Sequence, residues 1–322
     1  MNEMKFDGRV AIVTGAGRGL GRAYASLLAA RGAKVVVNNR IRQGTEGETP
    51  IAQEAVEAIT SAGGIATANT ADIGTKEGAR SVVETALKAF GRVDIVVNNA
   101  GIVQFHKYPD YPDDEMETMI AIQLRGTWFV TQAAWPHLQR QGYGRVINTV
   151  SRGAFFGDPQ GAAYAASKGA VYGLTRALAV EGREHGILVN AISPVAWTPL
   201  YARAPDVSAE RKKLLQEKFS PTWVSPVIVA LAHASCPFTG EVIGAGGGHV
   251  SRMYMAQTQG TQIAVDFTPE EFVRRLPEIW AQQDSIAMGL VKPGTRGGGT
   301  PVTEVPPAAI PRSAANAAVH HE

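Results

Sequence analysis

The sequence of 322 residues has little cysteine, little net charge and no long apolar run, and each of these limits excludes a class of protein. One cysteine, Cys236, excludes an internal disulfide framework and cysteine-rich zinc sites. The 31 Lys and Arg residues nearly balance the 29 Asp and Glu residues, so the charge gives no argument for a nucleic-acid partner. The apolar runs are far shorter than the ~20 residues of a membrane span, and the start of the chain lacks the apolar segment of a secretory signal. These features predict a cytoplasmic globular protein without a metal site, a nucleic-acid partner or a membrane partner.

Short apolar segments alternate with longer helical patterns over the first 250 residues. The segments are nearly continuous in apolar residues, as strands are when helices cover both faces of a parallel sheet. Strands are expected at 9–13, 33–38, 65–69, 93–98, 145–150, 187–192 and 241–244, and helices at 20–30, 50–61, 75–90, 113–139, 161–185 and 226–235. The alternation predicts an α/β fold, a doubly wound Rossmann-type parallel sheet of about seven strands with helices on both faces.

The composition changes after residue 250. Residues 251–290 are expected to form a partly helical C-terminal extension, in which Thr268 caps a helix that starts with Pro269 and two glutamates. Residues 291–322 are rich in Pro, Gly and Ala and have few large apolar side chains to bury, which predicts an extended or disordered tail. The expected organisation is therefore a catalytic and dinucleotide-binding domain over 1–250, followed by these two segments.

A glycine-rich turn follows the first expected strand. It reads Thr-Gly-Ala-Gly-Arg-Gly-Leu-Gly over residues 14–21 and runs directly into a helical pattern. Glycines at such a turn let backbone N–H groups approach a pyrophosphate, which then lies at the positive end of the helix. An ordinary strand–helix connection is the alternative, but the place after the first strand of an alternating sheet favours a dinucleotide site.

The spacing Thr-Gly-x-x-x-Gly-x-Gly resembles that of the short-chain dehydrogenase/reductase family, and later motifs strengthen the resemblance. The segment 98–101 reads Asn-Asn-Ala-Gly, Ser151 lies just beyond the fifth expected strand, and Tyr164-x-x-x-Lys168 follows. These motifs occur in family order and at family spacing over residues 6–248. The resemblance implies an enzyme that transfers a hydride between a nicotinamide cofactor, NAD(P), and a secondary alcohol or ketone.

The resemblance also implies the catalytic roles. Tyr164 would exchange the hydroxyl proton, Lys168 would hold the nicotinamide ribose and tune Tyr164, and Ser151 would orient the substrate oxygen. Because Tyr164 and Lys168 share a helix face, we expect the lysine charge to lower the pKa of the tyrosine. Gln123 stands where the family usually has a catalytic asparagine. Either it anchors a water beside the catalytic lysine, or it satisfies backbone groups in its own helix.

The cofactor-binding residues follow from the same resemblance. Asn99 would either contact the cofactor or hold the fourth strand against its neighbour, and Asp72 would either lie beside the adenine or be a turn residue. The full set of expected contacts is Gly15, Arg18, Gly19, Leu20, Gly21, Asn39, Arg40, Asp72, Ile73, Asn99, Ala100, Gly101, Tyr164, Lys168 and Pro194.

The end of the second strand bears on cofactor choice. NAD-specific relatives usually have an acidic residue about 20 residues beyond the glycines, which binds the ribose 2′-hydroxyl. Asn39 stands there in this sequence, and Arg40, with Arg18 or Arg42, could pair with a 2′-phosphate. We therefore expect NADP(H). The alternative is that Arg40 and Arg42 are exposed loop charges and the cofactor is NAD(H).

Residues 124–135, 178–183 and 225–247 resemble one branch of the family, the (3R)-hydroxyacyl-CoA dehydrogenase unit of peroxisomal multifunctional enzyme type 2. The branch implies a bulky substrate such as a 3-hydroxyacyl-CoA, with a steroid or terpenoid alcohol as the alternative. A non-catalytic dinucleotide-binding regulator on the same fold is an alternative of another class. In the family, helices equivalent to 113–139 and 161–185 pair across a two-fold axis, which implies a homodimer or homotetramer.

The segment 194–224 is expected to cover the substrate. It carries the aromatic residues Trp197, Tyr201, Phe219 and Trp223, which could line a large pocket. Its basic residues, Arg203, Arg211, Lys212, Lys213 and Lys218, either meet CoA phosphates or belong to a solvated helix over 208–218.

Overall fold

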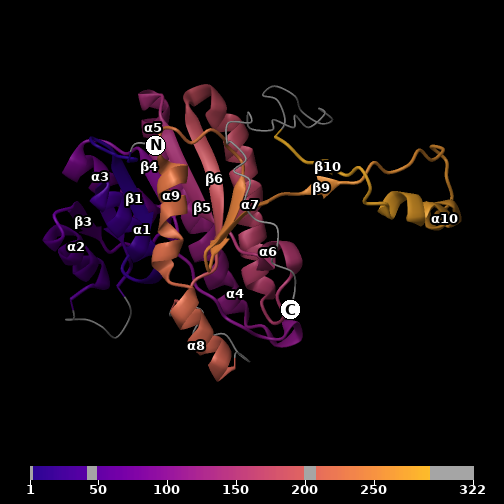
Figure 1. Cartoon of the computed structure of the whole chain (residues 1–322), viewed down its shortest axis with the longest axis horizontal. Coiled ribbons are helices and arrows are strands. Elements are labelled where there is room, and N and C mark those ends of the chain that lie inside the picture. The colour runs from indigo at the N-terminus through magenta and orange to yellow at the C-terminus, as the bar shows by residue number, and fades with distance from the viewer. Residues whose placement is uncertain (1–2, 42–48, 199–207, 291–322) are drawn as a thin grey trace, which may run out of the picture. The chain divides into compact units, whose positions relative to one another are not determined.

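The computed structural model describes residues 3–41, 49–198 and 208–290 (Figure 1). It divides into two compact units, Met1–Tyr254 and Met255–Glu322. The predictions about Arg42, Tyr201, Arg203 and the tail over 291–322 lie outside the described residues, as does the side chain of Arg211.

Among the described residues of the first unit, eight strands form one sheet in the order β3-β2-β1-β4-β5-β6-β7-β8. All neighbouring strands are parallel except β8, which pairs antiparallel with β7 from Val242↔Met253 to Gly246↔His249. The bounds are β1 (Val10–Thr14), β2 (Lys34–Asn38), β3 (Ile65–Asn69), β4 (Ile95–Asn98), β5 (Gly144–Thr149), β6 (Ile187–Pro194), β7 (Val242–Gly246) and β8 (His249–Met253). The doubly wound parallel sheet is thus confirmed. The eighth strand was not predicted, since its exposed and mixed residues lack the apolar run of the other strands.

Helices cover both faces of this sheet (Figure 1). Helices α1 and α2 pack against each other and α1 packs against α9, whereas α3 packs against α5 and α7 packs on β5 and β6. The bounds in the first unit are α1 (Gly19–Ala30), α2 (Ile51–Ser61), α3 (Lys76–Phe90), α4 (Asp113–Ile120), α5 (Gly126–Gln141), α6 (Gly153–Phe156), α7 (Ala162–Gly182), α8 (Ala209–Lys218) and α9 (Ser225–Ala232). Short 3₁₀ turns lie at Tyr108–Asp110, Arg183–His185 and Pro221–Trp223.

The prediction of one continuous helix over 113–139 is wrong in one detail. A π-helical turn, Ala121–Arg125, separates α4 from α5. Such a turn inserts one extra residue into the helix and turns the side chains that follow it. Apolar periodicity does not reveal it, because the flanking segments keep a regular helical pattern.

The sheet core explains why these segments are strands. Every residue of β1 and β4 is buried, and Ile12, Ile95 and Ile147 are fully buried side chains. Each large apolar side chain removed from water stabilises the fold by roughly 1.5–3 kcal/mol. A continuous apolar run therefore specifies a central strand covered on both faces.

The second unit contains α10 (Pro269–Trp280) and the short antiparallel pair β9 (Ala256–Gln257) and β10 (Ile286–Ala287). The predicted N-cap is present: the Thr268 side chain accepts a hydrogen bond from the Glu271 N–H at 3.2 Å. None of the described helices is long and apolar enough to cross a membrane.

Candidate active site

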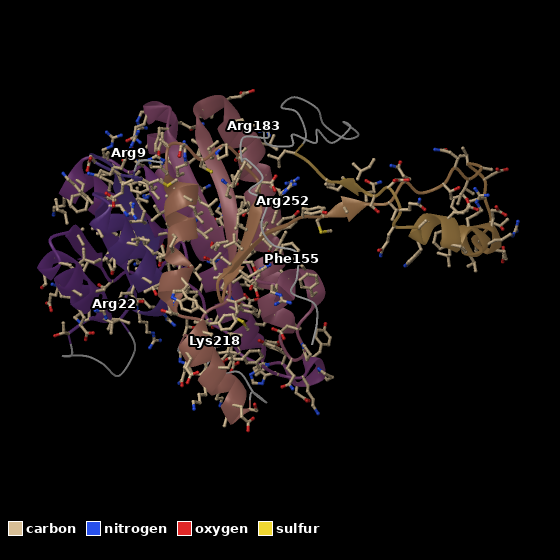
Figure 2. The ribbon with its side chains drawn as sticks, in the orientation of Figure 1. Arg9, Arg22, Phe155, Arg183, Lys218 and Arg252 are labelled. Carbon is tan, nitrogen blue, oxygen red and sulfur yellow. The ribbon has the colours of Figure 1, made fainter. Side chains whose placement is uncertain are left out.

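The polar residues of the candidate site lie at the carboxyl ends of the parallel strands. The glycine turn follows β1, Asn99 follows β4, Ser151 follows β5 and Pro194 ends β6. Helices α4 and α8 lie at this end of the sheet (Figure 1). Lys218 on α8 marks the same end, whereas Arg9, which precedes β1, lies at the opposite one (Figure 2). Open α/β sheets bind their ligands at the carboxyl edge.

The backbone of the glycine turn has conformations and close contacts that favour glycine. Gly15 has φ +63° and Gly19, the first residue of α1, has φ +58°. A Cβ atom on Gly21 would lie 2.4 Å from the Gly15 carbonyl oxygen and 2.5 Å from Asn99 Nδ2. Arg18 precedes α1 as its N-cap, with extended backbone and no capping hydrogen bond from its side chain. The open backbone at the start of α1 fits a dinucleotide pyrophosphate, for which these residues supply N–H groups.

Asn99 holds this turn against β4. Its Nδ2 donates to the carbonyl oxygens of Thr14 at 2.9 Å and Gly15 at 3.2 Å. The backbone N–H groups of Asn99 and Ala100 both donate to Thr14 Oγ1 at 3.1 Å. The described contacts of Asn99 therefore match the expected strand-holding role, and they align the Ala100–Gly101 backbone beside the glycine turn.

Polar side chains follow β2 and β3. The Asn39 Oδ1 accepts a hydrogen bond from the Gly17 N–H at 3.4 Å, so the second strand is tied to the glycine turn by a neutral group. Arg40 forms an ion pair with Asp72, Nη1 to Oδ2 at 3.4 Å, with both side chains about half exposed. The other oxygen of Asp72 accepts from the Gly74 N–H at 2.8 Å, which is the expected turn geometry. Ile73 is buried, and its side chain lies against Gly126 at the start of α5.

The residues predicted to be catalytic lie together near the carboxyl end of β5. The Ser151 side chain interacts with that of Tyr164, and its hydroxyl accepts a hydrogen bond from the Gly153 N–H at 3.2 Å. Lys168 lies one turn along α7 from Tyr164, and its Nζ is 5.8 Å from the centre of the tyrosine ring. That Nζ donates to the Thr149 carbonyl oxygen at 2.9 Å. The structure thus brings Ser151, Tyr164 and Lys168 together as predicted.

The expectation that Lys168 lowers the pKa of Tyr164 is wrong for this structure. Burial raises the pKa of Tyr164, the hydrogen bond with Ser151 opposes that rise, and the Asp158 carboxylate adds to it. Burial also lowers the pKa of Lys168 to about 7. Since the lysine itself loses much of its charge near neutral pH, desolvation outweighs the attraction that the spacing suggested.

Gln123 lies in the π-helical turn and is completely buried. Its Nε2 donates to the Ile102 carbonyl oxygen at 3.1 Å, whereas its Oε1 has no hydrogen-bond partner among the described residues. A Cβ atom on Gly101 would lie 3.4 Å from that Oε1 and 3.7 Å from Lys168 Nζ. The amide therefore binds a backbone group in the loop after β4, not one in its own helix as one expectation had it. Its unpaired acceptor lies near the lysine, and the water that the other expectation places there stays a prediction.

The segment over 194–224 is described in part. The Trp197 N–H donates to the Phe219 carbonyl oxygen at 2.7 Å, and the Phe219 ring lies against Gly247, where a Cβ atom would come within 2.6 Å of it. Trp223 is half exposed. The helix expected over 208–218 is present as α8, in which Leu215 is buried and Lys213 and Lys218 are exposed.

Sequence reasoning missed a polar network that positions α7. Asn98 Nδ2 donates to Asn148 Oδ1 and to Thr131 Oγ1, both at 2.9 Å, and Asn148 Nδ2 donates to Thr175 Oγ1 at 3.0 Å. The network joins α5 to α7 through the paired strands β4 and β5. Asparagines inside two otherwise apolar strands were the available signal, because buried amides need partners.

Comparison with known proteins shows the family to which the chain belongs. The sequence model of the family described as "short chain dehydrogenase" matches residues 9–203, which is more than half of the chain. The chain belongs to the short-chain dehydrogenase family. This short-chain dehydrogenase is therefore an NAD(P)-dependent oxidoreductase that acts on CH–OH groups. Among its described residues, no group of three or more His, Cys, Asp and Glu side chains could hold a metal ion.

Two relatives are similar over most of this short-chain dehydrogenase. The peroxisomal hydratase-dehydrogenase-epimerase of Neurospora crassa is 35% identical over 86% of the chain, which spans only 30% of that relative's length. A short-chain type dehydrogenase/reductase of Mycobacterium tuberculosis is 36% identical over 84% of the chain and 93% of its own length. The relatives thus include both a large multifunctional protein and a protein of about this size.

Two solved structures share the fold. A short-chain dehydrogenase from Mycobacterium avium has a TM-score of 0.73 and 32% identity, covering 85% of this chain and 96% of its own. A gluconate 5-dehydrogenase from Burkholderia cenocepacia, in complex with NADP and tartrate, has a TM-score of 0.67 and 28% identity, covering 76% of this chain and 96% of its own.

Proposed function

We propose that the chain is an NADP(H)-preferring dehydrogenase or ketoreductase of bulky secondary alcohols and ketones, with Tyr164 as its proton donor and acceptor. One observation carries the catalytic part: the side chains of Ser151 and Tyr164 interact at the carboxyl edge of the sheet, with Lys168 one helical turn along α7. Two hydroxyls in this position could both reach the oxygen of one substrate, and one of them can exchange a proton with it.

Each catalytic side chain has a separate task in this proposal. Ser151 is held by the Gly153 N–H and donates its hydroxyl proton to the substrate oxygen, which orients the substrate. Tyr164 then takes the hydroxyl proton of an alcohol, or gives its own proton to a ketone. When bound, the nicotinamide cofactor supplies the hydride chemistry. The protein contributes position, proton transfer and exclusion of water.

In this proposal Lys168 and Gln123 form a path for the transferred proton. Lys168 uses one N–H for the Thr149 carbonyl oxygen, and the remaining donors are available to the nicotinamide ribose and to a water. The unpaired Gln123 Oε1 lies on the same side of Gly101 as the lysine Nζ. A water bound between them would let the proton pass from the buried lysine toward solvent.

Two features support a preference for NADP(H). Asn39 is neutral where a carboxylate would repel a 2′-phosphate, and it already binds the Gly17 N–H. Among the described residues Arg40 pairs with Asp72, and exposed ion pairs contribute less than about 1 kcal/mol. The guanidinium can therefore leave Asp72 for a phosphate. The Burkholderia structure that shares the fold contains NADP.

Cofactor preference is tested by kcat/KM for NADPH and NADH in the wild type and in Asn39→Asp. We expect the wild type to prefer NADPH and Asn39→Asp to lose that preference, since the new carboxylate repels the 2′-phosphate. Lys88→Gln, which removes a charge on an exposed position of α3, serves as the control. A wild-type preference for NADH would contradict the proposal.

The substrate class rests on the relatives and on the segment after β6. The Neurospora relative is named a hydratase-dehydrogenase-epimerase, and Phe219 and Trp223 provide apolar surface on the segment that follows Pro194. We propose 3-hydroxyacyl-CoA thioesters first, and steroid or terpenoid alcohols second. A screen of these alcohols with both cofactors, followed at 340 nm, identifies the class; turnover of steroids without acyl-CoA turnover would favour the second.

Tyr164→Phe tests the proposed chemistry. The variant should lose roughly 10²–10⁴-fold in kcat or more while it binds cofactor nearly as the wild type does, because only the hydroxyl is removed. Tyr172→Phe is the matched control, since Tyr172 is on the same helix and packs edge-on against Phe155. If Tyr164→Phe keeps more than about a tenth of the activity, Tyr164 is not the proton donor.

A further inference from the structure

Asp158 lies in the loop that joins α6 to α7, and in the sequence it stands between Ser151 and Tyr164. Its side chain lies against two glycines that have no Cβ atom. A Cβ atom on Gly153 would lie 3.3 Å from Asp158 Cβ, and one on Gly161 would lie 3.2 Å from it. The Asp158 carbonyl oxygen also accepts from the Gly161 N–H at 3.0 Å. The Cβ atom of the aspartate is therefore packed between the two glycines.

The carboxylate of Asp158 lies near the Ser151 hydroxyl. The Cβ position at Gly153 is 3.5 Å from Asp158 Oδ2 and 3.7 Å from Ser151 Oγ, so both oxygens border the same point. The charge of Asp158 also acts on the Tyr164 hydroxyl, whose pKa is raised first by burial and further by this carboxylate. An anionic oxygen thus stands beside the pair of hydroxyls that would hold the substrate.

The Asp158 carboxylate has no hydrogen-bond or ion-pair partner within the described part of the chain. Asp158 is exposed, and no described residue donates a hydrogen bond to its side chain or forms an ion pair with it. A carboxylate with free lone pairs accepts a donor group and repels another anion.

Other charged groups near Tyr164 are already engaged. Lys168 on the same helix donates to the Thr149 carbonyl oxygen. Helix α4, which packs against α7, carries Glu115, and its carboxylate is 2.7 Å from His106 Nε2. Arg152 beside Ser151 lies over the Phe156 ring, 5.7 Å from its centre. Of these groups and Asp158, only Asp158 has a charge that shifts the pKa of Tyr164.

We propose that Asp158 is a specificity-determining residue, which repels substrates with a carboxylate attached to the carbon next to the reacting one and accepts a hydrogen bond from substrates with a donor there. The favoured class is alcohols and ketones whose neighbouring group is neutral, such as a thioester, or is a donor, such as a second hydroxyl. Free 3-hydroxy acids are disfavoured. This inference rests on the proposed function, because it assumes that the substrate oxygen lies between Ser151 and Tyr164.

The experiment compares two substrates with the same reacting carbon, 3-hydroxybutyrate and its neutral N-acetylcysteamine thioester. We measure kcat/KM for both with the wild type, Asp158→Asn and Asp110→Asn. Asp110 is an exposed aspartate whose charge has no effect on Tyr164, so it controls for lost charge alone. In Asp158→Asn the ratio of thioester to free acid should fall about fivefold or more, the factor that one like charge gives at contact distance in water.

The pH dependence gives a second readout that a merely structural role would not move. Because Asp158 raises the pKa of Tyr164, the ascending limb of kcat/KM for thioester oxidation should move to lower pH in Asp158→Asn. Asp110→Asn should keep the wild-type limb. An unchanged substrate ratio in Asp158→Asn overturns the proposed specificity, whatever happens to the limb.

Failure of the proposed function would be visible separately. If the wild type oxidises neither substrate, the tyrosinate absorbance of Tyr164 can still be isolated as the difference between a protein and its Tyr164→Phe variant during a pH titration. The difference titration should move to lower pH when Asp158→Asn is added. A titration that does not move would show that the carboxylate does not act on the tyrosine, and would overturn the inference without any substrate.

Discussion

At the scale of single residues, burial decides the electrostatics of this site. Sequence spacing correctly predicted that Tyr164 and Lys168 would be neighbours, because residues four apart share a helix face. It did not predict that burial would raise the pKa of Tyr164 and lower that of Lys168 to about 7. Desolvation depends on what covers the helix, and the helix's own sequence does not contain that information.

The lowered pKa of Lys168 has a consequence for stability. Above pH 7 the folded protein releases the lysine proton, while the unfolded chain keeps it up to the ordinary value of 10.5. The unfolded state therefore binds more protons between these values, and the free energy of unfolding rises with pH there, by up to about 1.4 kcal/mol per pH unit. Below pH 7 both states are protonated and this contribution is constant.

Lys168→Met should remove the rise of the free energy of unfolding between pH 7 and 10.5. We expect the apoprotein of the variant to be more stable than the wild type at pH 7, and the difference to shrink as the pH approaches 10. Urea unfolding at pH 7, 8 and 9 measures it. The exposed Lys88 gives the control Lys88→Met, which should keep the wild-type slope. Parallel stability curves for wild type and Lys168→Met would show that the buried lysine keeps its proton in the folded state.

At the scale of elements, the strands and helices of the first unit were largely predictable. The expected strand over 65–69 coincides with β3, and α1, α2 and α3 begin within one residue of their predicted starts. Apolar runs and capping residues carry this information locally. The π-helical turn and β8 were not predicted, because the regular helical pattern continues on both sides of the first, and the second lacks an apolar run and forms by pairing with β7.

The glycine turn offers an element-scale test. Gly21→Ala places a methyl group within 2.5 Å of Gly15 O and Asn99 Nδ2, so the turn must open and its N–H groups must shift. We expect a loss of about 1–3 kcal/mol in the free energy of unfolding and at least a tenfold weaker binding of NADPH, measured by urea unfolding and by nucleotide fluorescence.

The control for this test is Gly63→Ala. Gly63 has φ +85°, and a Cβ atom there would touch nothing within 4 Å. The alanine is strained by its backbone and should cost about 1–3 kcal/mol without any contact to the site. Equal loss of NADPH affinity in both variants would mean that the glycine turn affects the cofactor only through general stability.

The π-helical turn places Gln123 for the proposed proton path. Gln123→Ala should lower kcat roughly tenfold or more and leave KM nearly unchanged, because proton release slows while ground-state binding is untouched. Gln123→Asn and Gln123→His keep a polar group that can hold a water and should retain substantial activity. All three variants disturb the hydrogen bond to the Ile102 carbonyl oxygen, so thermal unfolding separates that structural loss from the catalytic one. Wild-type kcat in Gln123→Ala across the working pH range would leave the residue a structural role only.

At the scale of the whole molecule, the two-fold assembly that the family resemblance implies would place α5 and α7 against the same helices of a second copy. Gly169 and Gly173 are one turn apart on α7, and a Cβ atom at either would meet no described atom of the chain within 4 Å. Small residues at i and i+4 let two helices approach closely. The proposed oligomer would use this open surface.

Gly173→Arg tests the assembly. Arginine favours a helix more than glycine does by roughly 0.5–1 kcal/mol, and it has room in the single chain, so the fold should persist. Near a two-fold axis the arginine would face its own symmetry copy, and bulk and like charge should oppose association. We expect light scattering after size exclusion to give at least a halved mass. Ala58→Arg, on an exposed position of α2, should keep the wild-type mass. An unchanged mass for Gly173→Arg would place any interface elsewhere, because a tightly packed helix pair cannot accept two guanidinium groups at its centre.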